Sequence, residues 1–145
     1  MKALATLAVL ALLAGPAAAK PGDVISVTGA WTRPAASGLT DAGYLTVTNR
    51  GKTADRLLSA SSPQAGKIEM MLSVMNGDIS TMKPIGDGLE LAPGQTVRFE
   101  PGGYHLMLED LKHEQKLGGA MPVTLTFAKA GKVKAALTVA ASAPK

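Results

Sequence analysis

KIEMMLSVMNG, residues 67–77, is the stretch that decides the fold class, because it joins a strand pattern to a turn signal. Apolar and polar residues alternate along it, which is typical of a β-strand with one buried face. We expect the core to take the apolar set, which is Ile68, Met70, Leu72 and Val74. The opposite face is polar apart from Met71 and Met75, so we expect these two side chains to point outward among polar neighbours.

The dipeptide Asn76-Gly77 predicts that this strand turns back at once in a β-hairpin, because both central residues of a type I′ turn take positive φ. With these two residues as the loop, Met71 faces Met82 across the hairpin. Side chains that oppose each other directly share a face, with Cβ atoms roughly 5 Å apart. The hairpin is therefore expected to bring two thioethers together on its outer face.

The rest of the chain, from residue 23 onward, has the punctuation of an all-β protein. Short runs of Val, Ile, Thr and Leu alternate with clusters of Gly, Pro, Asn and Asp, and no window has a convincing helical period. The clearest further strands are expected at residues 23–29, 42–49, 56–60, 96–100, 122–128 and 132–140. About eight short strands joined by such turns favour a single all-β domain, a β-sandwich or Greek-key barrel.

A second informative strand, PGGYHLML at residues 101–108, sets an imidazole beside a thioether. Alternation places His105 and Met107 on one face and the apolar residues of the strand on the other. Histidine is the commonest metal ligand, and a thioether is a soft donor that selects Cu(I). Taken alone, the pair favours a plainer interpretation, in which Met107 fills the core and His105 is half exposed.

Together the two stretches offer four donors for one metal ion: Met71, Met82, His105 and Met107. Three thioethers and one imidazole form a soft, neutral set that suits Cu(I), whereas zinc prefers thiolate, imidazole or carboxylate, and Ca²⁺ and Mg²⁺ need oxygen. The chain has no cysteine and so lacks the thiolate of a blue-copper centre, which favours carrying copper over cycling its redox state. His113 lies among charged residues, and we expect it to be exposed to solvent.

The first nineteen residues have the layout of a secretory signal peptide. Lys2 precedes an Ala/Leu-rich run, a Gly-Pro break and an Ala-Ala-Ala cleavage motif that ends at residue 19, and the run is too short to be a transmembrane helix. We therefore expect residues 1–19 to be removed. The mature protein, residues 20–145, is expected to be one exported domain of 126 residues (145 minus 19) with no membrane span.

Charge and motifs argue against two classes of function. Without Lys2 the mature chain has 14 basic residues (15 minus 1) and 11 acidic residues, a net charge of +3, and the bases form no cluster. Nucleic acid is therefore not an expected partner. The chain also lacks a Gly-x-Ser-x-Gly motif, any cysteine, and a histidine with a carboxylate partner at a suitable spacing, so we do not expect an enzyme.

Short motifs that span nearly the whole mature chain carry a family resemblance. They are AWTRP at residues 30–34, YLTVTN at 44–49, SP at 62–63, MKP at 82–84, LAPG at 91–94, PGGYHLML at 101–108 and VTLTF at 123–127. In this order they resemble the periplasmic copper chaperone family called PCuAC, formerly a domain of unknown function. The most specific piece is the Pro-Gly-Gly-Tyr-His-x-Met strand.

The resemblance implies a cupredoxin-like β-barrel that binds Cu(I) at an exposed site. It further implies a periplasmic protein that helps to metallate the copper centres of cytochrome c oxidase, often alongside a thioredoxin-like Sco protein. The expected partners are thus the copper ion, a Sco-type protein and an oxidase subunit.

The family's ligand pattern is a His, about ten residues, a Met, about twenty-one residues and then His-x-Met. By position it implies Met82 as the middle ligand and His105 and Met107 as the closing pair, with a gap of 22 residues here (83–104). The first position falls on Met71, so this chain has methionine where the family has histidine, and a thioether is still a Cu(I) ligand. Met70 is the alternative fourth ligand if the hairpin register slips, and Met75 an outer, transient donor.

Two hypotheses of different classes follow. The first is a periplasmic Cu(I) chaperone whose exposed His/Met site exchanges the ion with a partner. The second is a copper-independent, exported β-sandwich interaction module. They differ in one simple observable, because a ligand that binds only the folded state must raise its thermal stability.

Overall fold

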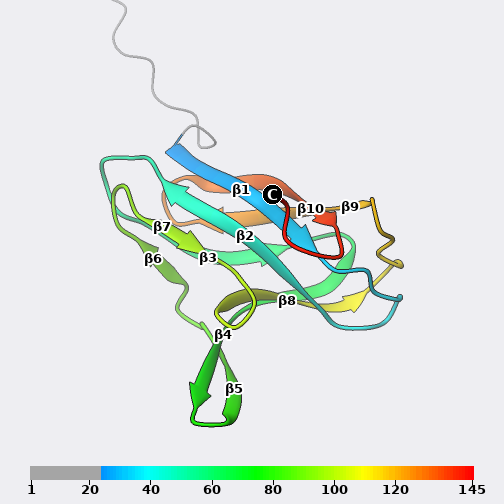
Figure 1. The fold of residues 1–145 in the computed structure, drawn as a ribbon. Helices are drawn as coiled ribbons and strands as arrows, with labels where there is room; N and C mark the ends of the chain where they lie inside the picture. The colour runs from blue at the N-terminus through cyan, green and yellow to red at the C-terminus, as the bar shows by residue number, and fades with distance from the viewer. Residues whose placement is uncertain (1–23) are drawn as a thin grey trace, which may run out of the picture.

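The computed structural model describes residues 24–145, and its ten elements are all β-strands (Figure 1). The predicted signal peptide, residues 1–19, and the predicted domain start at Lys20 lie outside the described residues. The strands are β1 (Ile25–Thr32), β2 (Asp41–Asn49), β3 (Asp55–Ser61), β4 (Ala65–Asn76), β5 (Ile79–Pro84), β6 (Leu89–Leu91), β7 (Thr96–Arg98), β8 (Tyr104–Leu111), β9 (Ala120–Phe127) and β10 (Gly131–Val139). The prediction of an all-β fold is confirmed, and within residues 24–145 no helix is long and apolar enough to cross a membrane.

All the strands belong to one sheet, in the order β5-β4-β8-β2-β1-β10-β9-β3-β6, with β7 pairing with β2 beside this path. β1 and β10 run parallel, and the other neighbours are antiparallel. β3 and β4 also lie against each other, although no backbone ladder joins these two strands. The sheet therefore curls around one core and closes at a seam between β3 and β4.

The core is filled by residues that alternate with outward-facing ones along the central strands. Fully buried members include Leu45, Val47, Leu57, Leu106, Leu108, Leu125 and Leu137. Complete burial of one such side chain stabilises the fold by about 1.5–3 kcal/mol. In β8, burial of Leu106 and Leu108 fixes which face of the strand points to the core. The residues that alternate with them must therefore point to the other face.

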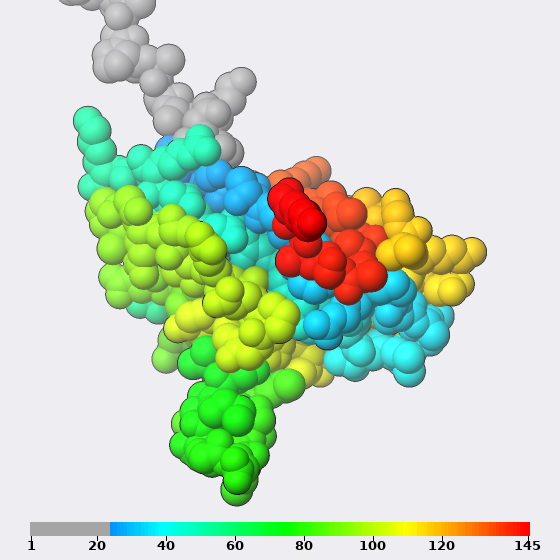
Figure 2. All heavy atoms as spheres, in the orientation of Figure 1, coloured from blue at the N-terminus to red at the C-terminus, as the bar shows by residue number. Residues whose placement is uncertain are grey.

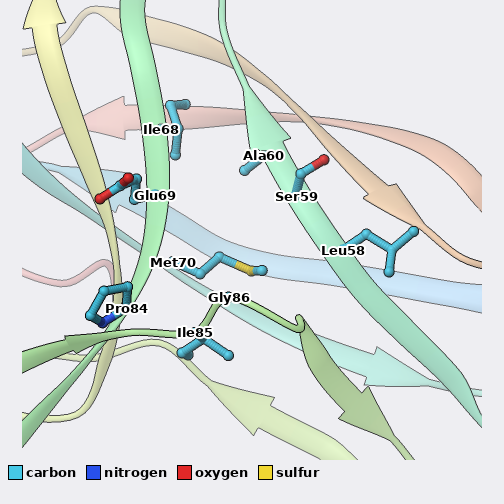
Figure 3. A pocket seen from close by; sticks show the side chains of 9 residues that line it. All are labelled: Leu58, Ser59, Ala60, Ile68, Glu69, Met70, Pro84, Ile85 and Gly86. Carbon is cyan, nitrogen blue, oxygen red and sulfur yellow. The ribbon is translucent and has the colours of Figure 1, made fainter.

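A pocket of about 160 Å³ opens at the seam between β3 and β4 (Figure 3). Ala60 of β3 and Ile68 and Met70 of β4 line it, together with the segment that follows β5. Figure 3 shows Met70 and Glu69 leaving β4 in opposite directions, with Met70 on the side of β3. Consecutive residues of β4 thus lie in two different environments, one in the seam and one on the far face of the strand.

The β4–β5 hairpin projects from the body of the molecule as a separate knob (Figures 1 and 2). β4 pairs with β8 along an inner half, residues 65–70, and with β5 alone along an outer half, residues 73–76. Met71 and Leu72 pair with both neighbours. β5 is an edge strand and is exposed along its whole length. The junction between hairpin and body therefore lies at Met71.

The predicted register of this hairpin is wrong by two residues. The two-residue loop begins at Gly77, one residue later than predicted, and Met82 lies opposite Ser73 rather than Met71. Gly77 has a φ of +62°, which suits the first loop position of a type II′ turn, where glycine supplies the positive φ. A shift of two residues keeps each side chain on its face, so the hydrophobic pattern does not distinguish the two registers.

Candidate metal site

Three of the four predicted donors come together where β4 and β8 pair. The register places Met71 directly opposite His105 and Glu69 directly opposite Met107. Directly opposed side chains share a face and lie within contact range. Met71, His105 and Met107 therefore gather on the face of the sheet that points away from Leu106.

Met71 lies on the predicted face of β4, opposite the core, but it is buried, with 8% of its surface exposed, so the prediction that it is exposed among polar neighbours is wrong. It lies outside the main core cluster, as do the buried residues Trp31, Tyr44 and Val139. The rings of Trp31 and Tyr44 pack in a tilted arrangement, with centroids 5.0 Å apart. Tyr44 shares the face of Met107, because the pairing of β2 with β8 sets Ala42 opposite Met107. The face of the sheet opposite the core therefore also carries buried side chains, among them Met71 and Tyr44.

His105 is 5% exposed, which excludes the half-exposed imidazole of the plainer interpretation. Its Nδ1 lies 3.2 Å from the carbonyl oxygen of Gly103. A carbonyl oxygen only accepts, so Nδ1 carries the proton and donates it, and in the neutral ring Nε2 is left with a free lone pair. Such a hydrogen bond from the second nitrogen is the usual way to orient a metal-binding imidazole.

Nε2 of His105 is the single buried side-chain nitrogen or oxygen without a hydrogen-bond partner in the part of the chain that the structure describes. The other buried polar side chains, Thr32, Asn49, Asp55 and Gln115, all have partners. Asp55, for example, accepts backbone N–H bonds from Lys129 at 2.8 Å and Ala130 at 3.0 Å. An orphaned buried group costs about 1–3 kcal/mol, so this nitrogen calls for a ligand.

Met82, the fourth predicted donor, lies at the rim and is exposed. It is opposite Ser73, which places it diagonally from Met71 on the same face of the hairpin. Diagonal neighbours are roughly 7–8 Å apart, within reach of long side chains. The structure therefore leaves one thioether at the surface next to the buried group of donors.

Met70, the alternative fourth ligand, lies on the wrong side of β4 to join this group. Its partner in β8 is Leu106, which is fully buried in the core, and its side chain lines the seam pocket. The ladder between β4 and β8 therefore places Met71, not Met70, beside His105. His113 is exposed, as expected.

Sequence reasoning missed Glu69, which faces Met107 at the other end of the site. Its carboxylate is hydrogen-bonded to Lys67 and raises the pKa of that amino group above its ordinary value. The alternation of residues 67–75 already placed Glu69 on the face of Met71, which was the available signal. Across residues 24–145 no three His, Cys, Asp or Glu side chains come close enough to hold a metal, so any metal here depends on the thioethers.

Comparison with known proteins gives a family. The model of the putative lipoprotein LpqE-like family matches residues 25–139. The putative lipoprotein Lxx21020 of Leifsonia xyli subsp. xyli is 32% identical over 108 residues, which are 74% of this chain and 64% of the relative. The chain thus spans less than two thirds of that curated relative.

Solved structures that this chain resembles are PCuAC domains. The copper-bound PCuAC domain from PmoF2 superposes with a TM-score of 0.65 at 27% identity, covering 82% of this chain and 94% of the domain. The apo PCuAC domain from PmoF1 gives 0.67 at 26% identity, with 82% and 95% covered. The Cu(I) form of DR1885 from Deinococcus radiodurans gives 0.59 at 28% identity, with 79% and 78% covered.

These likenesses confirm the resemblance to PCuAC domains that the sequence motifs indicated. They also confirm the fold class, since the neighbours share a cupredoxin-like fold with the ten-stranded sheet described above. The chain belongs to the putative lipoprotein LpqE-like family and has the cupredoxin-like fold of PCuAC domains.

Proposed function

We propose that this protein is an exported Cu(I) carrier that holds the ion with His105, Met71 and Met107, and with Met82 as an outer fourth ligand. The observation that carries the proposal is the orphaned Nε2 of His105, buried on a face that it shares with thioethers and oriented by the bond to Gly103. The copper-bound relatives support the choice of metal.

The chemistry of these donors suits transport better than catalysis. Thioethers and a neutral imidazole are soft donors that favour Cu(I), and none of them must lose a proton to bind it. Without a thiolate to hold the ion strongly, an incoming ligand can displace one thioether at a time. His105 and Met71 are buried while Met82 lies at the surface, so the ion reaches the inner ligands from the hairpin side. We propose no enzymatic activity.

We also propose a compartment for the protein and a destination for its copper. The family of putative lipoproteins supports an exported protein, and we propose the periplasm as its compartment. We further propose that the copper is delivered to the copper centres of cytochrome c oxidase, directly or through a Sco-type protein. This step is tested by mixing the Cu(I)-loaded protein with the acceptor and following the metal by size-exclusion chromatography.

The direct test is a titration of the purified mature chain with Cu(I), under reducing conditions and against the chelator bicinchoninate. We expect one tightly bound equivalent, and a large loss of affinity in His105→Ala and in Met107→Ala. The exposed His113→Ala serves as the matched control and is expected to bind normally. Unchanged binding in both site variants would contradict the proposal.

The projecting hairpin favours the second candidate, a copper-independent interaction module, because it exposes Met75, Ile79 and Met82. Large exposed apolar groups often mark a surface for partners. A thermal melt with and without Cu(I) distinguishes the two functions. A carrier must gain stability with Cu(I), by about 2.7 kcal/mol at 100 times the Kd, whereas a module without a metal site gains none.

A further inference from the structure

The soft donors of the chain follow a gradient of exposure along one face of the β4–β5 hairpin. From tip to base, Met75 is 61% exposed, Met82 is 55% exposed, and Met71 and His105 are buried. Met75 is not needed by the four-ligand site proposed above. It lies nearer to the tip of the hairpin than any of these four ligands.

The register shows that these residues share a face. Met71, Ser73 and Met75 are alternate residues of β4, and Met82 of β5 lies directly opposite Ser73. Met82 is therefore diagonal both to Met71 on one side and to Met75 on the other. Each diagonal spans roughly 7–8 Å between backbones, which long and flexible side chains can bridge.

The other face of the outer hairpin carries no donor of this kind. Its exposed apolar side chain is Ile79, 66% exposed, and its neighbours there are Val74 and Thr81. If Met75 served only to present an apolar surface, either face would do equally well. The two thioethers of the outer hairpin, Met75 and Met82, instead lie in one row with Met71 that ends at His105.

Met75 lies too far from the inner ligands to bind the same ion. It lies four residues along the extended strand from Met71, a span of about 13 Å at 3.3 Å per residue. A thioether at that distance has no effect on the ion held by Met71 and His105. It can meet the ion only before the ion reaches them or after it has left.

We propose that Met75 and Met82 form an outer dithioether site through which Cu(I) enters and leaves the inner site, an inference that rests on the proposed function. The ion arrives bound to soft ligands of its donor. Bonds from copper to the sulfurs of Met75 and Met82 form as ligands of the donor leave, and the bond to Met75 is then replaced by bonds to Met71, Met107 and His105. Met82 holds the ion throughout. Copper stays Cu(I), and no proton or electron moves.

An outer site at Met75 affects the rate of copper exchange but not the affinity for copper. Met75 lowers the barrier for exchange in both directions and does not contact the ion in the final complex. Its loss must therefore slow loading and release by the same factor and leave their ratio, the Kd, unchanged. Met82 differs, because it belongs to both sites and its loss changes the Kd as well.

The experiment compares stopped-flow rates of Cu(I) transfer from the loaded mature protein to bicinchoninate, and of loading from Cu(I) in acetonitrile, with the Kd from equilibrium competition. Met75→Leu removes the sulfur at nearly constant volume on an exposed site. We expect both rates to fall about tenfold, equivalent to about 1.4 kcal/mol in the barrier, with the Kd unchanged.

Two double variants provide the matched controls. Ser80 lies directly opposite Met75 on the same face, so Met75→Leu with Ser80→Met returns a thioether to the row and is expected to restore both rates. Ile79 is equally exposed but lies on the other face, so Met75→Leu with Ile79→Met is expected to stay slow. Both double variants carry the same number of methionines as the native chain.

The outcomes distinguish the two proposals. A native protein that binds no Cu(I) overturns the proposed function and the inference with it. Normal binding with native rates in Met75→Leu overturns only the inference. Rates restored by Ile79→Met show that any exposed thioether suffices, and a Kd weakened by Met75→Leu shows that Met75 is an inner ligand. Either result also overturns the outer site.

Discussion

In both halves of β4 the side chains alternate between the two faces of the strand, but the two halves have different surroundings. In the inner half Ile68 and Met70 are buried, whereas in the outer half Val74, on the same face, is only partly buried and Met75 is exposed. β8 flanks the inner half, and β5 alone flanks the outer half. Alternation therefore decides the face to which a side chain points, while the number of neighbouring elements decides whether it is buried.

The proposed chemistry lies where the two halves meet. Met71 is the residue of β4 that faces His105 in β8 and Pro84 in β5. Along this face of β4 the thioether of Met75 is exposed and that of Met71 is buried, so the buried donors begin at Met71. Buried ligands are held in place by packing, whereas exposed ones can exchange, and a carrier needs both kinds.

The largest effect is expected from His105→Leu, which removes the strongest donor of the inner half. Cu(I) affinity should fall by more than the 10–100-fold typical of losing an outer-shell partner, roughly 100-fold or more. The apo protein should become more stable by about 1 kcal/mol, because the orphaned buried Nε2 disappears. Chelator competition measures the first change and urea denaturation of the apo protein the second.

His113→Leu is the control for this variant, because His113 is exposed and outside the site. It should change neither quantity. Native Cu(I) affinity in His105→Leu would place the metal elsewhere in the molecule.

The next effect separates the two faces of the inner half. Met71→Leu should weaken Cu(I) binding about tenfold, or about 1.4 kcal/mol, by removing one thioether ligand. Met70→Leu, one residue away in the seam pocket, should leave the Kd unchanged. Both swaps nearly conserve volume in buried positions and should each cost less than about 1.5 kcal/mol of stability. Weaker binding in Met70→Leu alone would reverse the assignment of the β4 ligand.

A smaller change tests why methionine stands at the junction. Met71→His sets two imidazoles opposite each other and should raise the affinity for Cu(II) several-fold, since imidazole suits Cu(II) better than a thioether does. Electron paramagnetic resonance of the Cu(II)-titrated protein reports nitrogen ligation. Without any gain in Cu(II) binding, Met71 would not be a metal ligand position.

The smallest effect is confined to the outer half. Gly77→Ala places a Cβ on a residue with a φ of +62° and should destabilise the hairpin by about 1 kcal/mol. Because the hairpin projects from the body, hydrogen exchange should accelerate in β5 and residues 73–76 while β8 and the global melting temperature stay the same. Gly38→Ala, at a φ of +80° in a distant loop, is the control and should leave the hairpin's exchange unchanged.

The sequence was sufficient for features that depend on neighbours along the chain. Alternation placed His105 and Met107 on one face of β8, and the structure agrees, because Leu106 between them is fully buried. The chain-order motifs indicated PCuAC domains, and the solved relatives confirm that resemblance. The hairpin was expected at the right place, although its register was two residues out.

Features that depend on distant strands could not be read from the sequence. Whether Met70 or Met71 faces His105 is set by the ladder between β4 and β8, whose paired residues are more than thirty positions apart (105 minus 71 is 34). The hairpin register depends on the turn that Gly77 adopts, and two registers of equal face pattern compete.

By itself, then, the sequence determined the all-β class, the faces of β4 and β8 and the kind of donor on each, because strand alternation is a local property with a period of two. Only the tertiary structure decided that Met71 and His105 are buried together, that Nε2 of His105 has no partner, and that Met82 and Met75 stay exposed. The reason is physical: burial and hydrogen bonding depend on which distant strands lie alongside, and a one-dimensional pattern does not contain that information.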